Sequence, residues 1–197
     1  KNLLREGIIC NYEQIDPSRT FSCVLNSFPP SILHLFLCCS LLLWSQSGLA
    51  LVVVNEIHFN PPENPIREEF VELYNTDKSA ADISGWRLSG AIKYSFPEGT
   101  TIPAGGFLVV AEDPLTLTSN FGITAIGPYR GQLDSEGETV YLRDLNDQIA
   151  DETDYKVGFP WPVAANGDGP SIELINPLLN NSLGSSWRSS RDGPTPG

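Results

Sequence analysis

Methionine is absent from this 197-residue chain, histidine occurs twice and cysteine four times. All four cysteines fall within the first fifty positions, so residues 51–197 can form neither a disulfide nor a cysteine-based metal site among themselves. His58 is the only histidine in that longer segment. A zinc site with several histidines and a histidine-dependent catalytic triad are therefore disfavoured there.

Basic residues are scarce relative to acidic ones, and the formal net charge is −12. Residues 1–50 contain three basic and three acidic residues, so residues 51–197 carry the whole excess. An acidic surface repels a polyanion, and nucleic acid is therefore not an expected partner. The chain also lacks the nucleophile-elbow, phosphate-loop and dinucleotide-binding glycine motifs in a suitable context.

Residues 31–50 predict a cleavable signal peptide. Residues 32–44 are apolar apart from one histidine and one serine, a run that is short for a membrane span and typical of a signal-peptide core. Gly48 and Ala50 place small residues before a cut ahead of Leu51. A buried helix and a retained membrane anchor are the alternatives.

The signal peptide predicts secretion or a cell-surface or envelope location, with membrane contact only through that segment. Residues 1–30 are interpreted as a disordered or mis-started leader outside the fold. The folded domain is predicted to span residues 51–178. Residues 179–197 are rich in Ser, Gly and Pro and are interpreted as a C-terminal extension or linker.

From Leu51 onward the pattern is that of an all-β domain. Short runs rich in Val, Ile, Tyr and Phe alternate with clusters of Gly, Pro, Asn and Asp, which is typical of β-sandwiches. Residues 113–122 have room for one helical turn. The predicted strands are 51–59, 69–75, 83–89, 92–96, 106–111, 138–143, 147–151 and 171–175.

Seven phrases follow one another along this domain. They are "VVVNEIHFNP" (52–61), "EFVELYNTD" (69–77), "DISGWRLSG" (82–90), "FPEGTTIPAGGFLVVAED" (96–113), "GETVYLRDLNDQIAD" (137–151), "WPVAANGDGPSIELINP" (161–177) and "WRSSRDGPTPG" (187–197). In this order they resemble the lamin tail domain, in the form found in large secreted and surface proteins of bacteria. The resemblance implies an immunoglobulin-like β-sandwich, in agreement with the strand pattern.

The resemblance also has implications for function. The family has no established catalytic residues, so it implies neither an enzyme nor a cofactor. The coiled-coil rod of nuclear lamins is absent from this sequence, and nuclear scaffolding is not implied. Bacterial relatives commonly sit beside other extracellular modules, which suggests a similar setting for this domain.

Glu56 and Glu72 are the first candidate site. Each lies in a predicted strand among apolar residues, where an unpaired carboxylate is costly to bury. Alternate residues from 52 to 58 are expected to share one face, and pairing of the first two strands would bring Glu56 close to Glu72. Three interpretations are open: an acid–base pair, a calcium site, and two structural anchors. The anchors, which we favour, would accept hydrogen bonds from a tryptophan, from Arg67 or Arg87, or from backbone amides.

Two acidic loops are weaker calcium candidates. Asp144, Asn146 and Asp147 offer oxygen ligands at short spacing, but the same residues suit the turn of a β-hairpin. The hairpin is the favoured interpretation. Asp168 lies in "NGDGP" (166–170), where turn geometry alone explains the glycines.

Trp161 is a weak candidate for ligand contact. It lies in "FPWP" (159–162), where prolines keep it out of central strands, and an exposed aromatic face could stack on a sugar ring. A core or lid position is the alternative, and Trp86 is expected in the core.

The leading functional hypothesis is a non-catalytic structural, adhesion or protein-interaction module of a secreted or cell-surface bacterial protein, which positions a neighbouring domain. Its partners would be other domains of the same polypeptide or envelope proteins. One alternative is a carbohydrate- or calcium-dependent binding module, with a glycan as partner. Another is an accessory domain of an extracellular enzyme whose catalytic part lies outside this chain. No catalytic residue and no cofactor is assigned, with calcium left open.

Overall fold

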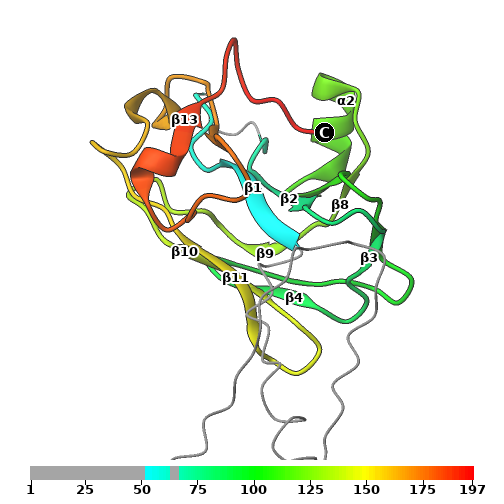
Figure 1. The fold of residues 1–197 in the computed structure, drawn as a ribbon. Coiled ribbons are helices and arrows are strands. Elements are labelled where there is room, and N and C mark those ends of the chain that lie inside the picture. The colour runs from blue at the N-terminus through cyan, green and yellow to red at the C-terminus, as the bar shows by residue number, and fades with distance from the viewer. Residues whose placement is uncertain (1–51, 63–66) are drawn as a thin grey trace, which may run out of the picture. The chain divides into compact units, whose positions relative to one another are not determined.

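Short strands with apolar residues on the inner face form two facing β-sheets in the described chain (Figure 1). The computed structural model describes residues 52–62 and 67–197, which all belong to the unit Gly48–Gly197. The predicted leader (1–30) and signal peptide (31–50) lie outside the described residues. The all-β, immunoglobulin-like architecture predicted from the sequence is confirmed.

The larger sheet has six strands in the order β13–β12–β1–β2–β7–β8. All neighbours are antiparallel except β7 and β8, which are parallel. The strands are β1 (Val52–His58), β2 (Phe70–Asn75), β7 (Phe107–Ala111), β8 (Ala125–Ile126), β12 (Ile172–Leu174) and β13 (Trp187–Ser189).

The second sheet has five strands in the order β11–β10–β4–β5–β9, and β3 pairs with β6 in a small two-stranded sheet. Every run predicted as a strand overlaps an observed strand. Strands β3, β6, β8 and β9 were not predicted because each spans only two residues, and β13 was not predicted because its segment has the composition of a linker. The remaining strands are β3 (Ala81–Asp82), β4 (Arg87–Gly90), β5 (Ile92–Ser95), β6 (Thr101–Ile102), β9 (Arg130–Gly131), β10 (Thr139–Arg143) and β11 (Ile149–Asp154).

Side chains that point between the two large sheets form the main core. Val71 and Leu73 from β2 and Val140 and Leu142 from β10 are all fully buried. Burial alternates along β10, as the two-residue period of a strand requires. Complete burial of one such side chain stabilises the fold by about 1.5–3 kcal/mol. Trp86 is half-buried and packs against this core.

One helix, α2 (Pro114–Phe121), covers part of the other face of the six-stranded sheet. Asp113 caps it by accepting hydrogen bonds from the backbone amides of Leu115 and Thr116, and Gly122 ends it with a φ of 70°. The helix has two turns, not the one predicted. Its Leu117 is buried in a second small apolar cluster, which also contains Phe70, Val109 and Ala111. No helix in the described part of the chain is long and apolar enough to cross a membrane.

The segment predicted as a linker, residues 179–197, is part of the fold. Strand β13 pairs with β12. Two short 3-10 helices flank β12 along the chain: η1 (Val163–Ala165) precedes it and η2 (Gly184–Ser186) follows it. Trp187 is buried against Trp161, with ring centroids 6.0 Å apart, and its indole N–H donates to the Asn181 carbonyl at 2.8 Å. The linker prediction is therefore wrong for β13, because one buried tryptophan outweighs the polar composition around it.

Asp151 on β11 links the two sheets. Its carboxylate accepts hydrogen bonds from the backbone amide of Val54 in β1 and from the Asn181 side chain, both at 2.7 Å. Burial is the largest cause that raises the pKa of Asp151, to about 6. A single side chain thus fastens β1 to the opposite sheet and to the loop before β13.

Candidate functional site

Three glutamates lie in one row across adjacent strands of the six-stranded sheet. Glu56 on β1 is the cross-strand partner of Glu72 on β2 and, on its other side, of Glu173 on β12. Directly paired residues have Cβ atoms about 4.5–5.5 Å apart, and like charges at that distance repel. The prediction that Glu56 and Glu72 lie close together is confirmed. We call Glu56, Glu72 and Glu173 the acidic row.

A β-bulge in β1 places Glu56 in this row. The register changes from Val54 opposite Leu73 to Glu56 opposite Glu72, so Asn55 is an extra residue in β1. Val54 therefore joins the main core with Leu73, while Glu56 points to the opposite face. The prediction that alternate residues from 52 to 58 share one face is wrong, because the bulge shifts the alternation by one residue.

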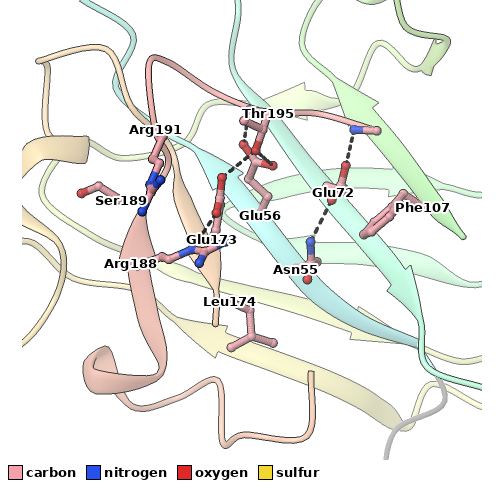
Figure 2. A pocket seen from close by; sticks show the side chains of 11 residues that line it. Asn55, Glu56, Glu72, Phe107, Glu173, Leu174, Arg188, Ser189, Arg191 and Thr195 are labelled. Carbon is pink, nitrogen blue, oxygen red and sulfur yellow. Dashed lines mark hydrogen bonds and ion pairs between the residues drawn. The ribbon is translucent and has the colours of Figure 1, made fainter. Parts of the chain in front are cut away.

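Each carboxylate of the row has hydrogen-bond donors from distant parts of the chain (Figure 2). Glu56 accepts from the Ser171 hydroxyl at 2.5 Å and from the backbone amide of Thr195 at 2.8 Å. Glu72 accepts from the Asn55 side chain at 2.9 Å and from the backbone amide of Gly197 at 2.6 Å. Backbone amides are among the donors expected for these two anchors.

The donors from the end of the chain belong to residues 194–197, which we call the C-terminal arm. The arm crosses the acidic row with Pro196 buried, and two of its backbone amides point at carboxylates. A Cβ atom at Gly197 would lie 3.2 Å from Cγ2 of Ile123, so the arm also reaches the segment after α2. The acidic row therefore holds a segment more than one hundred residues away from two of its members.

Glu173, at the outer end of the row, contacts an arginine side chain and the hydroxyl group of Thr195. The guanidinium Nε of Arg188 donates to Glu173 at 2.9 Å. The Thr195 hydroxyl lies 2.6 Å from Oε1 of Glu173 and 3.2 Å from Oε2 of Glu56. This hydroxyl therefore touches two of the three carboxyl groups at once.

Burial disfavours the ionised forms of the inner glutamates. It is the largest cause that raises the pKa of Glu56 to about 7, and the charges of Glu72 and Glu173 act in the same direction. Hydrogen bonds from Ser171 and Thr195 oppose this rise. Burial also raises the pKa of Glu72, against the hydrogen bonds of Gly197 and Asn55.

The row, the arm and β13 line a cavity of about 590 Å³. Its walls include the half-exposed ring of Phe107 and the guanidinium groups of Arg188 and Arg191. Figure 2 shows the three glutamates on its floor beneath the arm. The cavity combines an acidic floor, two basic side chains and one aromatic ring, and the carboxylates of its floor bind backbone amides of the arm.

The sequence was compared with protein-family descriptions and with curated proteins. The description of the lamin tail domain matches residues 45–156. The chain belongs to the lamin tail domain family. No curated protein matches the chain. Glu56 and Glu72 lie inside the matched residues, whereas Glu173 and the arm lie beyond them.

Lamin tail domains are immunoglobulin-like modules without catalytic activity, and in general they mediate protein interactions. In this lamin tail domain neither Arg67 nor Arg87, the two arginines expected as partners, is bonded to a glutamate of the acidic row. Arg87 instead forms an ion pair with Asp147. Its side chain lies on the five-stranded sheet, which explains why it does not reach the acidic row.

The first acidic loop forms the turn of the β10–β11 hairpin, as the favoured interpretation predicted. The Asp144 carboxylate accepts hydrogen bonds from the backbone amides of Asn146 and Gln148, both at 2.8 Å. Asp147 has a φ of 66°, a left-handed turn conformation that aspartate tolerates. The carboxylates thus serve the turn itself.

The second acidic loop, residues 166–170, lies against the end of β1. Asn60 donates from its side chain to the Asn166 side chain at 2.6 Å, and Asp168 lies between two glycines with positive φ. Among residues 52–62 and 67–197, no group of three or more His, Cys, Asp or Glu side chains is arranged to hold a metal ion. The calcium hypothesis therefore stays a prediction without support from the described residues.

Trp161 is buried and does not offer a face for sugar stacking. It is 6% exposed, lies against Trp187, and contacts Gly184 closely enough that a Cβ there would lie 2.8 Å from the indole ring. The ligand-contact prediction is wrong for this structure, because the prolines that exclude Trp161 from a strand place it beneath the loop before β13. Phe159, at 97% exposed, is the open aromatic of that segment.

Two acidic anchors were missed from the sequence. Glu173 completes the row, and a shared pattern would have found it: each of the three glutamates directly precedes an aliphatic residue within a strand. Glu69 is the other, since it accepts hydrogen bonds from the Tyr129 hydroxyl and the Leu133 backbone amide, both at 3.0 Å. Burial raises the pKa of Glu69. No local sequence signal points to those two donors, which lie sixty or more residues away.

Proposed function

We propose that the chain is a non-catalytic interaction module of a secreted or cell-surface bacterial protein, and that it positions a neighbouring domain. Family membership supports the general part of this proposal, because lamin tail domains are immunoglobulin-like interaction modules. The predicted signal peptide (31–50) supports the location. The anchored arm supports the positioning role.

The observation that carries the proposal is the path of residues 194–197. A free segment rich in Ser, Gly and Pro samples many conformations and leaves whatever follows it to tumble. Here the backbone amides of Thr195 and Gly197 are bonded to Glu56 and Glu72, and Pro196 is buried between them. A polypeptide that continues from an arm held in this way leaves the sandwich in one direction.

The proposal is tested by fusing a fluorescent protein directly after Gly197 and measuring its time-resolved anisotropy at pH 6. We expect the fused domain to rotate with the whole particle. The variant Glu72→Ala removes the acceptor of the Gly197 amide, so its fused domain should rotate faster. The matched control is Glu98→Ala, because Glu98 is exposed and lies outside the row. Independent tumbling of the domain fused to the unchanged chain would contradict the proposal.

A further inference from the structure

The Thr195 hydroxyl lies between two carboxyl groups, 2.6 Å from Glu173 Oε1 and 3.2 Å from Glu56 Oε2. A hydroxyl carries one proton, so it donates to only one of these oxygens. If both carboxyl groups were ionised, the other oxygen would face the hydroxyl lone pairs without a proton between them. The contact is favourable on both sides only when one carboxyl group is itself protonated.

The surroundings assign that proton to Glu56. Glu173 accepts from the cation of Arg188 at 2.9 Å, which favours its ionised form. Glu56 is 1% exposed, has no ion-pair partner among the described residues, and lies between the carboxyl groups of Glu72 and Glu173. The resulting chain of bonds runs from Glu56 Oε2–H to the Thr195 hydroxyl, and from that hydroxyl to Glu173 Oε1.

We propose that the C-terminal arm is a proton-operated clasp, which closes on the acidic row when Glu56 is protonated and opens when Glu56 ionises. Closing brings Thr195 and Pro196 over the row and completes the chain of hydrogen bonds through the hydroxyl. Opening returns Glu56 to water, where its charge is stabilised. The arm and the proton therefore bind cooperatively.

The direction of the pH effect follows from the two states of Glu56. In the closed state burial, together with the charges of Glu72 and Glu173, raises its pKa to about 7, and hydration in the open state moves it back towards the ordinary value of 4.5. Closing therefore takes up a proton between these two values. The stabilisation of the closed arm by this proton is fully present below pH 4.5 and is lost as the pH rises through 7.

Other charged groups around Glu56 act in known directions. Glu72 on β2 and Glu173 on β12 oppose its ionisation. Arg188 on β13 is engaged with Glu173, and Arg191 lines the cavity with an exposed side chain. His58 on the same strand bonds the Glu68 carbonyl, and residues 194–197 carry no titratable side chain. Among these groups, Glu56 is the one that the Thr195 hydroxyl links to the arginine-paired carboxylate of Glu173.

The clasp is tested on the full chain with a ¹³C-labelled Thr195 methyl group, whose NMR signal does not exchange with water. We expect an ordered methyl group at pH 5 and a mobile one at pH 8. The ratio of closed to open arm should fall by up to about 70-fold between these values. In the same sample, the Glu56 carboxyl carbon should titrate near pH 7. A midpoint near the ordinary value of 4.5 would overturn the proposal.

The decisive variant is Glu56→Gln, because a glutamine amide donates to the Thr195 hydroxyl as the protonated acid does and cannot ionise. Its arm should stay closed from pH 5 to pH 8, whereas the control Glu98→Gln should open like the unchanged chain. An opening transition that persists in Glu56→Gln would overturn the clasp.

The clasp depends on the arm that carries the proposed function, but the two fail differently. An unchanged chain whose arm is ordered at both pH values would overturn the clasp and leave the positioning role intact. An arm that is mobile at every pH would overturn both.

Discussion

The acidic row and the β10–β11 turn contain the same kind of side chain in opposite circumstances. Glu56 and Glu72 are each 1% exposed, and their donors come from residues 171, 195 and 197 as well as from Asn55. In the turn, Asp144 is bonded by amides two and four residues away, and the Asp147 side chain is 61% exposed. Both groups looked like calcium candidates in the sequence.

The difference shows what decides the role of a carboxylate in this fold. A local partner shapes a turn, and water supplies the remaining hydrogen bonds at little cost. A distant partner joins two parts of the chain and removes the carboxylate from water, so its loss leaves buried donors unsatisfied. The energetic weight of an acidic residue here therefore grows with burial and with the distance along the chain to its donor.

The largest expected effect is at Glu69. Glu69→Ala leaves the Tyr129 hydroxyl and the Leu133 amide buried without their acceptor, at about 2 kcal/mol each, so the free energy of unfolding should fall by about 4 kcal/mol. Urea denaturation measures this loss. The adjacent Glu68→Ala serves as the control, because the Glu68 carboxylate accepts a hydrogen bond from the Asn120 side chain at an exposed contact. Equal losses of unfolding free energy in the two variants would contradict the distinction between buried and exposed carboxylates.

A smaller, pH-dependent effect is expected at Asp151. Its folded pKa of about 6 lies above the ordinary value of 3.8, so its contribution to stability is present below pH 3.8 and is lost as the pH rises through 6. Asp151→Asn keeps an oxygen acceptor for Val54 and Asn181 but cannot ionise. Relative to the unchanged chain, the variant should gain about 3 kcal/mol between pH 3.8 and pH 7, measured as unfolding free energy. A constant difference across that range would contradict the prediction.

The smallest effects are expected in the β10–β11 turn. Asp144→Ala removes an exposed acceptor of two turn amides and should cost about 0.5–1 kcal/mol, as loss of a helix cap does. Asp147→Asn retains a residue that tolerates positive φ and weakens only exposed ion pairs, at less than about 0.5 kcal/mol. Thermal melting of both variants checks this order. A loss in the turn as large as that of Glu69→Ala would remove the distinction between the two groups.

Much of the fold could be predicted from the sequence. The pattern of apolar residues predicts strands such as β2 and β10. The predicted bounds of these strands agree with the observed ones within one or two positions. Strands β3, β6, β8 and β9 could not be predicted, because two residues carry no period. Strand β13 was missed for a different reason: its single tryptophan lies in a segment whose composition is that of a linker.

The candidate site was predicted only in part. The pairing of Glu56 with Glu72 follows from the adjacency of two successive strands. The arm does not follow from any local pattern, because Thr195 lies 139 residues from the glutamate that it contacts. Composition describes what a segment does alone in water, and here the arm is ordered by acceptors that another part of the chain supplies.

The bulge at Asn55 has a consequence for insertions and deletions. Changes of length are usually confined to loops, because a loop absorbs an extra residue without altering its neighbours. Removal of the one extra residue of β1 would restore strict alternation beyond Val54. Glu56 would then directly follow Val54 and still pair with Glu72 on the outer face, and Ile57 would still pair with Val71 in the core. The strand should therefore tolerate this deletion, which would remove the hydrogen bond from Asn55 to Glu72 and leave the two faces of the sheet unchanged.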